Sequence, residues 1–201
     1  STVMPLDAGD IIDEYGCDAL RISLLIGISP GNDARYFTEK IESGRNFTNK
    51  LWNIARFVLL SVESCENVPL PKGDHRGLPD RWILSRFSTV IKEVTAHFEK
   101  YEFSQAGEKL RDFTWNEFAD WYLEIAKIQR LASSGERLET DKILLYILRQ
   151  LLILWHPFMP FVTEVIHSVI LHARQSLDDG GSASEGSGEK DLLIVQPWPE
   201  V

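Results

Sequence analysis

The chain has 201 residues, of which 44% are hydrophobic and 25% charged, and its mean hydropathy is −0.14. These values are typical of an ordinary globular protein, long enough to bury a core without disulfides or metals. Two cysteines exclude a disulfide framework and a cysteine-rich zinc site, and they favour a reducing cytosol. No run approaches the roughly 18 uncharged apolar residues that a membrane span requires. We therefore expect a cytoplasmic protein with no membrane partner.

The net charge of −9 argues at first sight against a nucleic-acid partner, but its distribution weakens that argument. Residues 1–20 hold five acidic residues and no basic one, and residues 178–191 hold five acidic residues and one lysine. These two stretches carry −5 and −4, so together they account for the whole excess. Residues 33–56 carry five basic and three acidic residues, a local charge of +2. Such a patch permits a phosphate-bearing partner without proving one.

Apolar residues recur at the 3.6-residue period of an amphipathic helix through most of the chain. Asp7 fits an N-cap position, Pro160 sits where a helix can begin, and the run before it, up to Trp155, is apolar all round, which predicts a central helix. Gly107 and Thr114 permit a bend within the fifth helix. The predicted helices are, in chain order, 6–16, 18–26, 38–62, 80–101, 104–131, 140–155 and 160–174.

The remaining segments read as loops and one strand. Proline and glycine mark residues 64–79 as a loop, and the glycine, serine and acidic residues of 178–188 predict a mobile loop. Residues 192–195 form a β-like run that prolines close, which predicts a single strand. We therefore predict a mainly α fold, an antiparallel helical bundle with a short terminal β-strand.

No residues form a recognisable catalytic or metal-binding arrangement. The five histidines lack metal-ligand spacing, and His167 and His172 would point about 140° apart on a helix. The sequence contains no nucleophile elbow and no glycine loop of the kind that binds phosphate. It therefore predicts no catalytic residue and no metal ligand.

The segment 115–122 concentrates aromatic side chains beside acidic ones. Phe118, Trp121 and Tyr122 lie at i, i+3 and i+4 of a helix, and each of these side chains buries a large area. We therefore interpret the segment as core packing, with Asp120 or Glu124 available to an arginine of a neighbouring helix.

The predicted helix 38–62 carries a polar flank beside its apolar stripe, and Phe47 is assigned to the core. At 100° per residue the flank contains two arginines, a lysine, three asparagines and a tryptophan: Arg45, Asn46, Asn49, Lys50, Trp52, Asn53 and Arg56. Arginine and lysine bind phosphates, asparagine offers a donor and an acceptor to base edges, and an aromatic ring stacks on an unpaired base. This flank could therefore contact RNA. The alternative is a solvated face with Trp52 half in the core.

Several segments, taken together, resemble class I aminoacyl-tRNA synthetases of the valine, isoleucine and leucine group. Residues 12–21, IDEYGCDALR, are similar to the family pattern I-x-x-Y-G-A-D-A-L-R that follows the lysine-rich signature loop, with Cys17 in place of the usual alanine. The resemblance runs from about Leu6 to Pro199, where PWP is similar to the exit from this region of the family. Further blocks resemble the valyl-tRNA synthetases specifically: SPGND at 29–33, RNFTNKLWN at 45–53, WNEF with DWY within 115–122, and HPFMPF at 156–161.

The resemblance implies a C-terminal fragment of a valyl-tRNA synthetase. Its parts would be a stem-contact or connector segment at 1–36, a helical-bundle anticodon-binding domain at 37–175, a flexible acidic Gly/Ser-rich loop at 176–191, and a terminal strand and exit at 192–201. The H-I-G-H and K-M-S-K-S motifs of the family do not occur in these residues, so we expect no catalysis by the chain itself. ATP and Mg²⁺ would serve the parent enzyme, and no cofactor is expected here.

The resemblance also implies that the polar flank lines the surface that holds the anticodon loop of a valine tRNA. Arg35 joins the candidate tRNA-binding residues, because it matches a position where the family commonly has a basic residue close to the anticodon. The expected partners are this tRNA and the catalytic domain of the parent chain. Two alternatives stay open: the same domain of an isoleucyl-tRNA synthetase, against which block 45–53 argues, and a helical scaffold that binds protein through Trp52, Trp121 and Trp155.

Overall fold

The computed structural model describes residues 7–28, 38–62, 77–131, 134–178 and 192–200. Its elements confirm the predicted helical bundle, and none of the described helices is both long and apolar enough to cross a membrane. The predicted loop 178–188 lies almost wholly outside these ranges, as does most of the predicted loop 64–79. The elements are α1 (Ala8–Tyr15), α2 (Cys17–Leu25), α3 (Thr38–Ser61), α4 (Leu78–Glu99), α5 (Phe103–Asp112), the π-helix η1 (Phe113–Tyr122), α6 (Leu123–Gln129), α7 (Ser134–Trp155), α8 (Pro160–Asp178) and the 3₁₀ turn η3 (Leu193–Val195).

Helix ends follow the local chemistry of the sequence. Asp7 caps α1 as predicted, because its Oδ1 accepts a hydrogen bond from the Gly9 backbone N–H at 3.0 Å. Gly16 ends α1 with a φ of 90°, a conformation that favours glycine. Two ends differ from the prediction, since α7 begins earlier, at Ser134, and α8 continues to Asp178.

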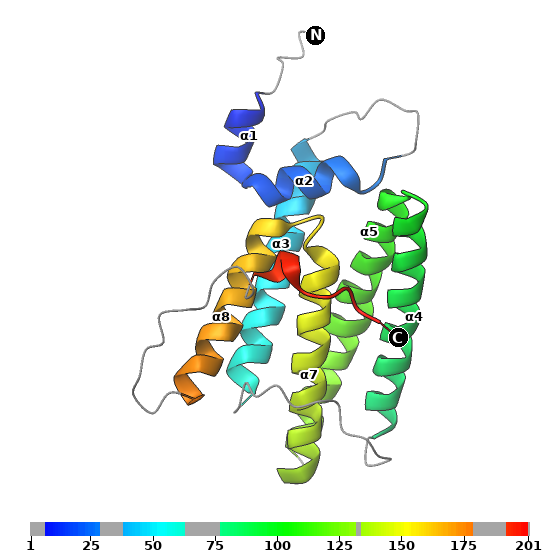
Figure 1. The fold of residues 1–201 in the computed structure, drawn as a ribbon, viewed down its shortest axis with the longest axis vertical. Coiled ribbons are helices and arrows are strands. Elements are labelled where there is room, and N and C mark those ends of the chain that lie inside the picture. The colour runs from blue at the N-terminus through cyan, green and yellow to red at the C-terminus, as the bar shows by residue number, and fades with distance from the viewer. Residues whose placement is uncertain (1–6, 29–37, 63–76, 132–133, 179–191, 201) are drawn as a thin grey trace.

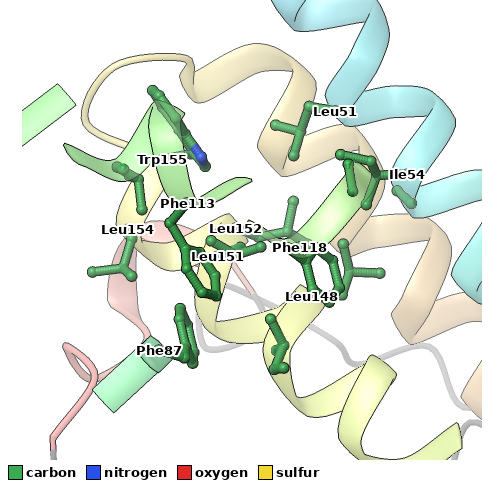
Figure 2. Packing of buried hydrophobic residues seen from close by; sticks show 14 of the residues in the cluster. Leu51, Ile54, Phe87, Phe113, Phe118, Leu148, Leu151, Leu152, Leu154 and Trp155 are labelled. Carbon is green, nitrogen blue, oxygen red and sulfur yellow. The ribbon is translucent and has the colours of Figure 1, made fainter. Parts of the chain in front are cut away.

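The bundle is organised around α7. In Figure 1, α3, α4, α7, α8 and the rod formed by α5, η1 and α6 run lengthwise, while α1 and α2 lie across one end. The backbone of α7 comes close to those of α3, α4, α5, α6 and α8, and also to that of η3. Figure 2 shows its leucines and Trp155 meeting apolar side chains of α3, α4 and η1; the labelled residues are Leu51, Ile54, Phe87, Phe113, Phe118, Leu148, Leu151, Leu152, Leu154 and Trp155. The prediction of a central helix is confirmed, but the helix is not apolar all round, because Arg149 and Gln150 lie on a half-buried edge.

The rod contains a π-helix that the helical period did not predict. Thr114 lies in it and is fully buried, with its Oγ1 donating to the Leu110 carbonyl and accepting from Trp155 Nε1. In a π-helix the hydrogen bonds run from i to i+5, so each turn is wider and the side chains rotate less per residue than in an α-helix. The packing prediction therefore holds for Phe118 and Tyr122, which are buried, and is wrong for Trp121, which is 67% exposed.

The predicted terminal strand is wrong. Leu193–Val195 forms a 3₁₀ turn. The described residues contain no β-strand with which this segment could pair. Its backbone finds other partners, because the Leu193 N–H donates to the Glu164 carboxylate at 3.0 Å. Trp198 then anchors the tail on the bundle, donating from Nε1 to Thr95 Oγ1 at 2.8 Å.

Gly44 allows α3 to approach α2 closely. A Cβ on this residue would lie 2.6 Å from the backbone oxygen of Ala19 and 2.8 Å from Cγ2 of Ile22, distances that real side chains do not tolerate. The backbone of α2 cannot yield as a flexible side chain could. A larger residue at position 44 must therefore push the two helices apart.

We predict that Gly44→Ala lowers the free energy of unfolding by about 1–3 kcal/mol, as overpacking of a tight contact does. Urea denaturation of the chain measures this change. Ser43→Ala, at an exposed position of the same turn, is the control and should change stability little. Equal effects of the two substitutions would contradict the close approach.

Candidate nucleic-acid interface

One side of α3 is buried and the opposite side is polar and exposed. Phe47 is 2% exposed, which confirms its assignment to the core, whereas Trp52 is 43% exposed and lies at the border between core and solvent. We call the exposed side the α3 polar face; it consists of Arg45, Asn46, Asn49, Trp52, Asn53 and Arg56. The structure thus brings together on one surface all the predicted site residues except Arg35, which lies outside the described residues, and Lys50, which lies at the edge.

Lys50 ties the edge of this face to the neighbouring π-helix. Its Nζ lies 2.9 Å from Oδ1 of Asp120 and 4.9 Å from the centre of the Trp115 ring. The ion pair is partly exposed, so it contributes little to stability, but it neutralises the lysine charge. A phosphate bound by Lys50 would have to compete with the Asp120 carboxylate.

Arg45 lies against helix α1. Its guanidinium carbon lies 6.0 Å from the centre of the Tyr15 ring, within reach of a cation–π contact. The pKa of Tyr15 lies above its ordinary value, because partial burial and then the hydrogen bond to Glu14 oppose ionisation. The ring therefore stays neutral at pH 7. A neutral ring does not cancel the charge of Arg45, which can still attract an anion.

The two arginines lie at opposite ends of the polar face. Arg45 and Arg56 are separated by about 16 Å along the helix axis, at 1.5 Å per residue. Between them, Asn49 and Asn53 present amide donors and acceptors, and Trp52 presents part of its ring. This order places two cationic groups at the ends of a surface whose middle carries amide and aromatic groups.

A hollow of about 410 Å³ adjoins the face between α3 and the rod. Asn46 belongs both to the hollow and to the polar face, and Trp115 lines the hollow from the rod. Its rim is acidic as well as basic, because Glu39, Glu42 and Asp112 accompany Arg111. The complete lining is Glu39, Glu42, Ser43, Asn46, Phe47, Arg111, Asp112, Trp115 and Asn116.

Sequence reasoning missed the contacts that hold this face in place. The pairing of Arg45 with Tyr15 and of Lys50 with Asp120 joins residues far apart in the chain, and no local pattern signals either one. It also missed the exposure of Trp121, which follows from the π-helix. No group of three or more His, Cys, Asp or Glu side chains able to hold a metal occurs in the described part of the chain.

The sequence of this chain is similar to those of tRNA ligases. A family model described as the anticodon-binding domain of tRNA ligase matches residues 80–201. A valine--tRNA ligase of Oceanobacillus iheyensis is 38% identical over 197 residues, and one of Bacillus cereus is 41% identical over 197 residues. Each alignment covers 98% of this chain and 20% of the relative, so the chain spans about a fifth of the length of these relatives.

The fold is shared with a solved structure. The complex of Agrobacterium radiobacter K84 agnB2 LeuRS with tRNA and LeuAMS contains a region that superposes with a TM-score of 0.65 at 19% identity, covering 96% of this chain and 20% of that one. The family match begins at Asp80, after the α3 polar face, but the alignments with the two ligases extend over nearly the whole chain. The chain belongs to the family of anticodon-binding domains of tRNA ligases.

Proposed function

We propose that this chain recognises the anticodon loop of a valine tRNA, as one domain of a longer valine--tRNA ligase. The observation that carries the proposal is the α3 polar face, which presents arginine, asparagine and tryptophan side chains on one exposed helix surface. The identity of about 40% with valine--tRNA ligases over nearly all of the chain favours valine over isoleucine as the amino acid of the parent enzyme.

Each residue type on the face has a distinct task in this proposal. Arg45 and Arg56 bind backbone phosphates, which sets the position of the loop but reads no sequence. Asn49 and Asn53 read base edges, and Trp52 stacks on an unpaired base. Because these groups stand on a regular helix, they are oriented before RNA binds, and less side-chain freedom is lost on binding.

The proposed mechanism is selection by contact energy. Binding of the correct anticodon loop positions the distant acceptor end of the tRNA for the catalytic part of the ligase. In this proposal ATP and Mg²⁺ serve that catalytic part, and the present chain acts in the cytoplasm as the tRNA-binding module alone. The isolated module binds weakly, because it forgoes contacts made by the rest of the ligase and carries an overall charge of −9.

We predict that Arg45→Ala and Arg56→Ala each weaken binding of a valine-tRNA anticodon stem-loop about tenfold, because each removes one charge-assisted phosphate contact. Both side chains are exposed, so the thermal unfolding midpoint should change little. Fluorescence anisotropy and thermal denaturation measure the two quantities. Lys92→Ala removes an exposed charge from α4 and should leave affinity nearly unchanged. Parallel losses of affinity and stability would show instead that the arginines are structural.

We predict that the chain binds the valine-tRNA stem-loop about tenfold or more tightly than a stem-loop whose middle anticodon base is changed. Affinity for both RNAs should fall steeply as salt rises, because phosphate contacts release counterions. Titrations at low and at moderate salt test both statements. Equal affinities for the two stem-loops that both fall with salt would show that the face makes only nonspecific phosphate contacts. Absence of binding, or binding insensitive to salt, would contradict the proposal and favour a protein-binding scaffold.

A further inference from the structure

The turn between α7 and α8, residues 156–159, leaves backbone groups that its own side chains cannot satisfy. The first backbone N–H groups of any helix have no partner within that helix. Helix α8 starts with Pro160, and the residue before it, Met159, has no side-chain oxygen that could act as an N-cap. The N–H groups of Phe161 and Val162 therefore need an acceptor from outside this helix.

Asp18 of α2 supplies that acceptor. Its Oδ1 accepts from the Phe161 N–H at 3.3 Å, and its Oδ2 accepts from the Val162 N–H at 2.6 Å. The side chain is only 6% exposed. Burial raises the pKa of Asp18, and the two backbone hydrogen bonds act against that rise. A carboxylate buried in this way is retained only where it is hydrogen-bonded, as it is here.

Arg21 forms a hydrogen bond on the other side of the same turn. It lies one helical turn after Asp18 on α2, and its guanidinium donates to the Pro157 carbonyl oxygen at 3.1 Å. The carboxylate thus lies at the positive N-terminus of α8, and the guanidinium lies beside the carbonyl groups that follow the C-terminus of α7. We call this pair of contacts the α2 lock.

Other contacts also hold α2, because α3 lies close against it at Gly44 and Ser104 Oγ accepts from the Gly27 N–H just beyond its end. Ile22 and Ile26 join the main core of the bundle, but apolar burial is non-directional. The hydrogen bonds of the α2 lock are directional and act on two sides of one turn. The lock also affects the polar face. Helix α1 packs on α2 and carries Tyr15, which lies against Arg45, so the orientation of α2 sets the surroundings of Arg45.

We propose that Asp18 and Arg21 are positioning residues that hold the connector helices α1 and α2 in one orientation on the bundle and thereby place Arg45 for RNA. The structural part of this proposal stands on the hydrogen bonds above. The part that concerns RNA rests on the proposed function.

Hydrogen exchange tests the lock without any RNA. In Asp18→Ala, the amide protons of Phe161 and Val162 and those of α1 should exchange about tenfold faster, while those in the middle of α4 should keep their protection. Asp18→Asn retains one acceptor oxygen and should keep part of the protection, and Asp13→Ala removes an exposed carboxylate of α1 as the matched control. Unchanged exchange in both Asp18 variants would overturn the lock.

A second variant covers the case in which Asp18→Ala does not fold. Arg21→Met removes the donor to Pro157 while keeping an apolar stem, and Arg21→Lys restores a donor. Faster exchange in α1 for Arg21→Met, with recovery in Arg21→Lys, is the expected result. Equal exchange in wild type and Arg21→Met would overturn the role of Arg21.

A double-mutant cycle on binding of the valine-tRNA stem-loop tests the link to RNA. If the lock places Arg45, the losses caused by Asp18→Asn and Arg45→Ala should be non-additive, because Arg45 is already misplaced in the first variant. The losses caused by Asp18→Asn and Arg56→Ala should add, since Arg56 lies at the far end of the face. Additive losses in both cycles would refute the link. A wild-type chain that binds no stem-loop would refute the proposed function instead, and hydrogen exchange would still decide the lock.

Discussion

The structure depends on the burial of α7 over most of its surface. Between Ile143 and Trp155 most residues are apolar and fully buried, and one half-buried edge remains, formed by Tyr146, Arg149, Gln150 and Ile153. The helices that pack on α7 therefore each turn an apolar stripe towards it. Because a helix that buries one side leaves the opposite side in water, this constraint also decides which residues of α3 face outwards. The α3 polar face is in this sense a consequence of the core, and Figure 1 shows α3 running lengthwise within the bundle.

Three contacts join that face to neighbouring elements. Gly44 lets α3 lie directly on α2, Lys50 joins its edge to Asp120 of the π-helix, and Arg45 rests on Tyr15 of α1. Each contact reaches a different element, so α3 cannot turn about its axis without breaking at least one of them. A surface fixed in this way suits recognition of a flexible RNA loop, since the protein loses little freedom when it binds.

The helices, the central position of α7 and the burial of Phe47 follow from apolar periodicity, which is a local property of the sequence. What could not be predicted depends on contacts between distant residues. The exposure of Trp121 depends on a π-helix in which Thr114 bonds to Trp155, and the tail forms a turn because Glu164 captures the backbone at Leu193. The polar face was predicted as a set of residues, and Asp120 was predicted as a possible partner for an arginine of a neighbouring helix. That the partner is Lys50, and that Tyr15 lies against Arg45, came only with the structure, because no spacing rule links these residues to α3.

Mapping of the RNA contact by NMR tests the central claim most directly. On addition of a valine-tRNA anticodon stem-loop, the largest chemical-shift changes should fall on the side-chain amides of Asn49 and Asn53, the indole N–H of Trp52 and the backbone around them. Signals from the tail and from the exposed side of α4 should stay in place. Shift changes concentrated on the tail or on α4, with α3 unaffected, would show that another surface binds the RNA and would contradict the account.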